Sequence, residues 1–440
     1  MKNKSGILQR ESYSLVSIGE SYQRLTHASG LEILLFPKQT STLYAILEVP
    51  FGSFDETYRI GQEIVVLPRG TAHFMEHQMF ETKSGVTVDE FFSSRGAESN
   101  AYTSFDKTAY LFSSTEQKRE CLQELVRFVT HPYFTKKNVE KERGIIAEEL
   151  REGLDNPYDN AYWGLMRLMY GDAPISNEVG GSEESISHVT AGVLKRAYRD
   201  RYRPDQMVLS IAGDLSEQEV IAAVDAAMAD RQPISEQEQI PTDIPTAPVR
   251  KEVYGARGGK PMSVTRPIFC FGIKDTDIPA TPQARCKKGV AMQMAMQMIF
   301  SSSSELSAQM YADGLISSYP NYSYTILKEY AFAMVSGESD EPDAVFDRIC
   351  RKTEQVAERG FGEEEFLRAK RTFYADYMRD FDSTEEIASA MLDCRDDGVG
   401  IFEFKNIIEQ TTKEECEETL RRLYREDARA FFTVDKNEKV

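Results

Sequence analysis

The spacing of two histidines constrains the fold of this chain more than any other feature of its sequence. His73, Glu76 and His77 follow the order His-x-x-Glu-His, which inverts the His-Glu-x-x-His signature of zinc-binding helices. Histidines four residues apart lie on one face of a helix, so both imidazoles can reach a single metal ion. Glu76 is then placed to act as a general base toward the attacking water. The alternative interpretation is an ordinary amphipathic helix that carries two histidines on its surface.

A metal site with a catalytic role needs a third protein ligand and an open coordination position. The acid-rich segment 139–150 is predicted to be helical and carries Glu142 and Glu149. These two carboxylates are two helical turns apart, so they are expected on the same face. An acidic helix taken alone is more often a solvated surface than a source of ligands.

With this helix downstream of the histidine motif, the sequence resembles the pitrilysin, insulysin and mitochondrial-processing-peptidase family of zinc peptidases. In that family a glutamate far beyond the second histidine completes the metal site, and a glutamate two turns before it supports the site. The resemblance implies one zinc ion per chain, with His73, His77 and Glu149 as ligands. It also implies that Glu142 supports the ligands and that Glu76 is the general base.

Residues 95–114 carry turn-forming residues and then β-formers, which predicts a hairpin. In the family that the chain resembles, the matching Asn-Ala-x-Thr segment is an edge strand against which the substrate pairs. The resemblance therefore implies a substrate-binding role for Asn100, Ala101, Tyr102 and Thr103. Edge pairing suits a peptide substrate, because an extended peptide offers backbone donors and acceptors whatever its sequence. The alternative is a purely structural hairpin.

Several other elements can be predicted from local patterns. Short apolar runs bounded by Gly or Pro predict strands within 30–37, 42–50 and 207–215. Residues 116–131 are predicted to form a helix that ends before Pro132, and a further helix is expected from Glu217.

The second half of the chain repeats the first weakly, which predicts two related domains. Residues 134–149 align with 361–376, and residues 96–110 resemble 314–330. The counterpart of the motif helix is 290–299, which has methionines but neither histidine nor acid. A methionine stripe at helical spacing favours core packing over a soft-metal site.

The predicted architecture is α+β, with two homologous α/β-sandwich domains joined by a linker, and the resemblance implies the mitochondrial-processing-peptidase-like metallohydrolase fold. The predicted divisions are a zinc-binding catalytic domain at 1–230, a linker at 231–255 and a homologous domain without a metal site at 256–440. A chain of 440 residues is long enough for at least two such cores.

In the resembled family the second domain supplies an arginine and a tyrosine around a Gly-Leu pair, and both help to hold the substrate carbonyl. The pair matches 314–315 here, but Met310 and Ser317 stand at the two functional positions. Methionine and serine cannot supply a cation and a phenol. Tyr319 and Tyr322 are alternatives with a different spacing. We therefore expect a homologous partner subunit that supplies the Arg and Tyr.

Charge and composition limit the partners and the compartment. The chain has 52 basic and 71 acidic residues, a net charge of −19, which argues against nucleic acid and anionic membranes as partners. The six cysteines are an even number, which in a long chain is only weak evidence for disulfides, and without a Cys-x-x-Cys pair they lack the usual spacing of thiolate metal ligands. No apolar run reaches the length of a membrane span or of a signal core. The prediction is a cytoplasmic protein.

Taken together, these features predict a zinc-dependent endopeptidase that cleaves peptides or unstructured leader segments as the metal-bearing subunit of a heterodimer. One alternative is a non-catalytic binding or scaffold subunit of the same family, although such proteins typically lose motif residues. Another is a zinc hydrolase of a non-peptide substrate, against which the predicted edge strand argues.

Overall fold

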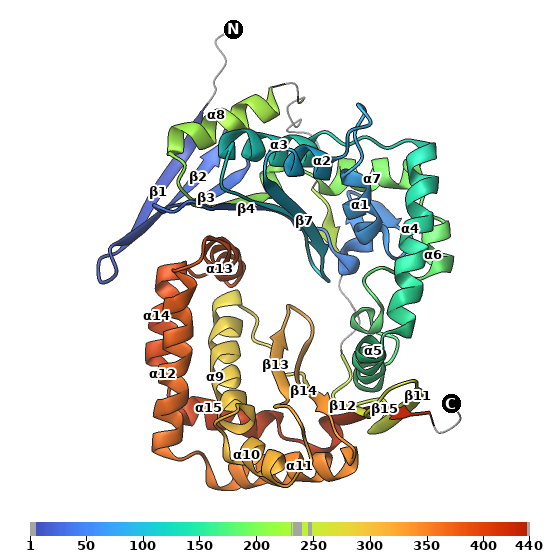
Figure 1. The fold of residues 1–440 in the computed structure, drawn as a ribbon, viewed down its shortest axis with the longest axis vertical. Helices are drawn as coiled ribbons and strands as arrows, with labels where there is room; N and C mark the ends of the chain where they lie inside the picture. The colour runs from blue at the N-terminus through green and yellow to red at the C-terminus, as the bar shows by residue number, and fades with distance from the viewer. Residues whose placement is uncertain (1–5, 230, 232–239, 245–248, 438–440) are drawn as a thin grey trace. The chain divides into compact units, whose positions relative to one another are not determined.

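The computed structural model describes residues 6–229, 231, 240–244 and 249–437, which pack into two compact units (Figure 1). Unit 1 combines 1–150, 178–246 and 379–395, and unit 2 combines 151–177, 247–378 and 396–440. The two units therefore exchange segments, so that 151–177 packs with the second half of the chain and 379–395 with the first. The sequential division at 1–230 and 256–440 stays a prediction. Much of the predicted linker 231–255 (232–239 and 245–248) lies outside the described residues.

Unit 1 is built on a seven-stranded sheet in which only β3 and β9 pair in parallel. Its strands, in spatial order, are β1 (Ile7–Leu15), β2 (Glu20–His27), β3 (Glu32–Pro37), β9 (Val208–Gly213), β4 (Leu43–Val49), β8 (Thr108–Ser114) and β7 (Ala97–Thr103). The strands predicted within 30–37, 42–50 and 207–215 are confirmed as β3, β4 and β9.

Successive side chains of this sheet point to opposite faces, and both faces are covered. On one face Leu47, Ile211 and the alternate residues of their strands belong to one hydrophobic core. Helix α3 (Lys118–Thr130) packs there against α8 (Glu217–Met228). On the opposite face, the Ser210 hydroxyl donates to the carbonyl of Ala388 in α13 (Thr384–Asp396), at 2.8 Å. Because both faces are covered, β4 and β9 are apolar along most of their length rather than alternating.

The remaining elements of unit 1 surround the histidine motif. They are η1 (Ser53–Glu56), β5 (Thr57–Ile60), β6 (Glu63–Val66), α1 (Thr71–Met79), α2 (Val88–Ser93), α6 (Glu183–Ser187), α7 (Ala191–Arg201), η3 (Pro204–Gln206) and β10 (Thr242–Asp243). Helix α4 (Lys136–Asp155) begins in unit 1 and ends in unit 2.

Unit 2 contains a five-stranded sheet and its own helices. The strands, in spatial order, are β11 (Arg257–Met262), β15 (Arg429–Lys436), β12 (Ile268–Asp275), β14 (Ala331–Glu338) and β13 (Asn321–Ile326). The helices are α5 (Pro157–Tyr170), η2 (Pro174–Ser176), α9 (Pro282–Phe300), α10 (Glu305–Ala312), α11 (Pro342–Arg359), α12 (Glu363–Asp380), α14 (Ile401–Gln410), α15 (Lys413–Leu423) and η4 (Glu426–Ala428).

The predicted repeat corresponds to matching elements in the two units. The first pair of similar segments falls on α4 and α12. The second pair covers β7 and the start of β8 in unit 1, and β13 up to the residue before β14 in unit 2. Helix α9 contains 290–299, the predicted counterpart of the motif helix. Met292, Met294 and Met296 on this helix are buried. This confirms core packing for the methionine stripe and the predicted organisation as two α+β domains.

Candidate metal centre

Helix α1 is fixed firmly at its first turn. Gly70 precedes the helix with φ 83°, and a Cβ at this position would lie 2.3 Å from the carbonyl oxygen of Gly180, so only glycine fits. The Ala72 N–H donates to Glu56 Oε1 at 3.3 Å, which satisfies one of the free N–H groups at the helix start. The start of α1 therefore depends on residues far away in the sequence.

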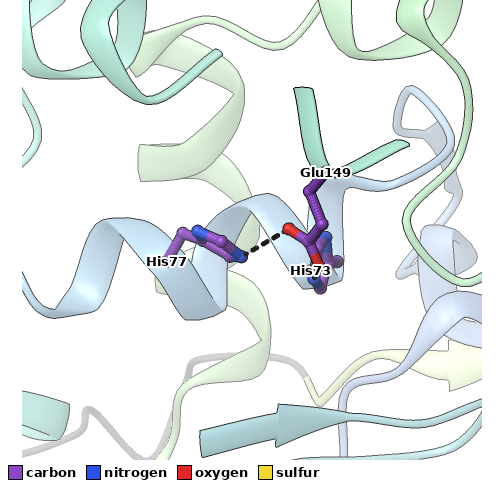
Figure 2. A group of neighbouring side chains, drawn as sticks. All are labelled: His73, His77 and Glu149. Atoms are coloured by element: carbon purple, nitrogen blue, oxygen red, sulfur yellow. Dashed lines mark ion pairs between the residues drawn. The ribbon is translucent and has the colours of Figure 1, made fainter. Parts of the chain in front are cut away.

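Three potential metal ligands converge from two helices (Figure 2). His73 and His77 lie on α1, and their Nε2 atoms are 3.5 and 3.3 Å from the two carboxylate oxygens of Glu149 on α4. One donor atom from each of the three residues lies within 4.8 Å of the others. Within the described ranges, this is the one group of three or more His, Cys, Asp or Glu side chains with such an arrangement.

Glu142, for which a supporting role is predicted, contacts one of the potential ligands, His77. Its Oε1 is 3.0 Å from His77 Nδ1, and its side chain is only 9% exposed. A carboxylate at Nδ1 fixes the ring so that Nε2 faces the metal position. Glu142 and Glu149 lie two turns apart on the face of α4 that meets α1, as their spacing predicts.

Ion pairs link the side chains of this group. Burial opposes protonation of His77, but its hydrogen bonds to Glu142 and Glu149 outweigh burial and raise its pKa to about 10. Hydrogen bonds from His73 and His77 hold the pKa of Glu149 well below its usual range. A bound divalent cation would replace the proton as the positive partner of these carboxylates.

The donor set fits zinc. Two imidazole nitrogens and one carboxylate oxygen are the ligands of many catalytic zinc sites, which leave a fourth position open. The Glu149 side chain is 50% exposed, so the group is accessible to solvent from that side. His73 Nδ1 is buried without a hydrogen-bond partner among the described residues, so packing beside Gly180 orients this ring.

Glu76 lies beside the ligands but is not one of them. It is buried on α1, and its Oε2 accepts a 2.5 Å hydrogen bond from the Thr103 hydroxyl on β7. A buried carboxylate one residue before a ligand histidine is suited to proton transfer.

The predicted substrate-binding residues lie on the edge strand of the unit 1 sheet. Among the described residues, β7 pairs only with β8. The Ala101 N–H donates to the side-chain oxygen of Asn100 at 2.8 Å. Tyr102 is 42% exposed. Thr103 has a second set of contacts, because its side chain reaches Glu76.

One residue that contacts the motif helix, Glu56, was not found from the sequence, and Thr103 was predicted to bind substrate rather than to contact Glu76. Glu56 binds the start of α1, and Thr103 contacts Glu76 through its side chain rather than its backbone. Burial raises the pKa of Glu56 to about 8, although neighbouring backbone N–H groups oppose the shift. No local pattern marks Glu56, whereas the Asn-Ala-x-Thr segment marked Thr103 as part of the site.

The two substituted positions of unit 2 are placed very differently. Met310 is fully buried, whereas Ser317 is exposed in the segment after α10. Tyr319 is exposed and stacks on Tyr311, with ring centroids 5.6 Å apart. The ring of Tyr322 lies near that of Phe300, with ring centroids 6.2 Å apart.

Comparisons with known proteins identify the family. A family model described as insulinase (peptidase family M16) matches residues 37–182, and the inactive domain of the same peptidase family matches 188–373. The chain is 30% identical over 396 residues to YmfH, an uncharacterized zinc protease of Bacillus subtilis, covering 89% of this chain and 91% of that protein. The chain belongs to the insulinase family.

Three further proteins are similar to this chain, with lower identity or lower coverage than YmfH. The zinc protease YmxG of Bacillus subtilis, also uncharacterized, is 29% identical over 44% of this chain and 47% of its own. An M16-like peptidase from Alicyclobacillus acidocaldarius has a crystal structure that matches with a TM-score of 0.89 and 25% identity, over 98% of both chains. Pitrilysin shares the fold, with a TM-score of 0.69 and 16% identity over 94% of this chain and 45% of pitrilysin.

One further property concerns membranes. The described part of the chain contains no helix that combines the length and the apolar character needed to cross a bilayer.

Proposed function

We propose that this insulinase-family chain is a zinc-dependent endopeptidase that cleaves peptides or unstructured leader segments. The observation that carries this proposal is the convergence of His73, His77 and Glu149, with Glu76 on the same helix but outside the ligand group. Zinc bound by the three ligands would polarise the substrate carbonyl as a Lewis acid. This arrangement supplies both a metal position and a separate base.

Residues of the protein provide proton transfer, orientation of a ligand and binding of the substrate. Glu76 takes a proton from the attacking water and passes it to the leaving amine, which is general base and then general acid catalysis. Glu142 keeps the His77 ring oriented. The backbone of Asn100 to Thr103 pairs with an extended stretch of substrate at the sheet edge.

The proposal includes a homologous partner subunit. Because Met310 and Ser317 replace the arginine and tyrosine of the second domain, this chain lacks two groups that would hold the substrate carbonyl. A partner that carries both would complete the site. We also propose a cytoplasmic location, which the buried free thiols of Cys121, Cys270, Cys286, Cys350 and Cys416 support.

The experiment combines metal analysis with a base variant. Purified protein is expected to bind one zinc ion, and changing His73, His77 or Glu149 is expected to lower occupancy sharply. Glu76→Gln is expected to keep the metal and lose turnover on a peptide pool, because the base is not a ligand. Glu148→Gln is the matched control, since Glu148 is exposed on the same helix as Glu149. Wild-type turnover by Glu76→Gln would refute the proposed chemistry, and zinc binding without any cleavage, in the presence as in the absence of the partner subunit, would favour a scaffold subunit.

A further inference from the structure

The Thr103 hydroxyl lies directly against the predicted general base. Thr103 Oγ1 donates a hydrogen bond to Glu76 Oε2, and the two oxygens are 2.5 Å apart. Thr103 is the last residue of β7, and Glu76 is buried on α1. The contact therefore joins the edge strand to the motif helix.

The proton of this hydrogen bond can be assigned from the neighbouring groups. Thr103 Oγ1 is also 3.4 Å from Thr108 Oγ1, but Thr108 donates its own proton to the carbonyl of Phe51 at 2.7 Å. Thr108 can therefore only accept, and Thr103 has one proton to give. The much shorter distance assigns that proton to the Glu76 carboxylate, since charge-assisted bonds are the shorter and stronger ones.

The position of the Thr103 hydroxyl is set by rigid surroundings. Thr103 faces the fully buried Thr108 as the last pair of the β7–β8 ladder. The following turn is bound to 53–54, with the Phe54 N–H donating to the Phe105 carbonyl at 2.7 Å. A Cβ at Gly52 would lie 2.4 Å from the Phe105 carbonyl carbon, so the two segments are in close contact. The hydroxyl cannot move far without breaking these contacts.

We propose that Thr103 is a positioning residue for Glu76, and this inference rests on the proposed endopeptidase function. Its hydroxyl holds Oε2, so that Oε1 is the oxygen left to accept the proton of the attacking water. In that step a water O–H bond breaks and the proton moves to Oε1. The electron pair left on the water oxygen bonds to the carbonyl carbon, and the pair of the C=O π bond moves onto the carbonyl oxygen. The Thr103 proton stays on its own oxygen throughout. Thr103 thus couples the strand that binds substrate to the base that acts on it.

The first test separates positioning from substrate binding. Thr103→Val keeps the branched shape but removes the hydroxyl, and it is expected to lower kcat about tenfold or more, because small misplacements of a catalytic group are costly. KM and zinc content should stay within about twofold of wild type, since the interaction is not made with bound substrate. Thr103→Ser restores the hydroxyl and should recover most of kcat. An unchanged kcat, or an effect on KM alone, would overturn the proposal.

A matched control comes from the same strand. The Ser99 hydroxyl on β7 donates to Asp89 at 2.7 Å, so Ser99→Ala also removes one hydroxyl-to-carboxylate bond without touching Glu76. Its kcat should stay within about twofold of wild type. A loss in Ser99→Ala as large as in Thr103→Val would show a general effect on the strand and overturn the assignment.

A second measurement needs no activity. Urea midpoints of the metal-free wild type, Thr103→Val, Glu76→Gln and the double variant form a cycle, and direct contact predicts non-additive shifts. Additive shifts would overturn the contact, whatever the enzyme does. Non-additive shifts together with full activity of Glu76→Gln would instead refute the proposed function, and with it the positioning role built on it.

Discussion

The supporting glutamate gives the most direct prediction at the scale of single residues. Glu142→Gln should reduce zinc affinity by about 10- to 100-fold, because the carboxylate no longer orients the His77 ring. Competition with a zinc chelator measures the change. Glu140→Gln, on the exposed face of the same helix, should leave affinity as it is. Equal affinities for both variants would contradict the supporting role.

The sequence predicted some of these residues and missed others for a physical reason. His73, His77, Glu142 and Glu149 could be found because their spacing is a property of helices, and helical period can be read locally. The structure brings His73, His77 and Glu149 together and places Glu142 against His77, while their metal-binding roles stay a prediction. The contact of Thr103 with Glu76 depends on how an edge strand packs on a helix, which no local spacing encodes.

At the scale of elements, the start of α1 should give the protein a distinct pH dependence. The folded pKa of Glu56 is raised to about 8 by burial, above its unfolded value. Between these two values the folded state binds the extra proton, so stability is full at low pH and falls as pH rises. The slope is up to about 1.4 kcal/mol per pH unit inside this window.

Comparing wild type with Glu56→Gln isolates this contribution. The variant keeps an acceptor for the Ala72 N–H but cannot ionise, so its unfolding free energy should fall less between about pH 5 and 8. Asp55, whose pKa burial also raises, to about 7, is present in both proteins and cancels in the difference. Urea unfolding of the metal-free proteins measures it, and parallel pH profiles would contradict the prediction.

The edge strand β7 predicts which substrates are cut. Backbone pairing requires an extended chain, so unstructured peptides should be cleaved and folded proteins should resist. The net charge of −19 should also speed association with basic peptides at low salt, an advantage that added salt screens. The measurement is kcat/KM for a basic and a neutral peptide of equal length across a salt series. Equal salt dependence for both, or rapid cleavage of folded proteins, would argue against this role.

Elements formed by local pattern were predicted well, whereas the exchange of segments between the units has no local signal. The methionine-rich helix α9 and the strands β3, β4 and β9 follow from apolar runs and turn residues. The packing of α13 on the unit 1 sheet, through Ser210 and Ala388, joins residues far apart in the chain. Such long-range contacts depend on which apolar face of the sheet is left for a distant helix to cover, and this cannot be predicted from the local pattern of a single sequence.

At the scale of the whole molecule, we expect the isolated chain to be a poor enzyme. Removing one donor that stabilises the developing oxyanion typically lowers turnover by about 10²- to 10³-fold, and the proposed half-site has Met310 and Ser317 at the two donor positions of the second domain. The defect cannot be repaired within the chain by Met310→Arg. Met310 is fully buried, so an arginine there would place an unpaired charge in the core and destabilise unit 2.

The test is complementation by a homologue from the same source that lacks the zinc motif but carries Arg and Tyr around its own Gly-Leu pair. Mixing the two purified proteins should raise peptide cleavage by at least about 10²-fold, with the zinc ligands of this chain and the donors of the partner forming one site. Changing the partner's arginine should abolish the gain, because the site then lacks a donor for the oxyanion. Glu76→Gln in this chain should abolish it too, because the site then lacks its general base. Full activity from this chain alone would contradict the half-site interpretation. In that case Tyr319, which is exposed, is the first residue to change, and Tyr322 the second.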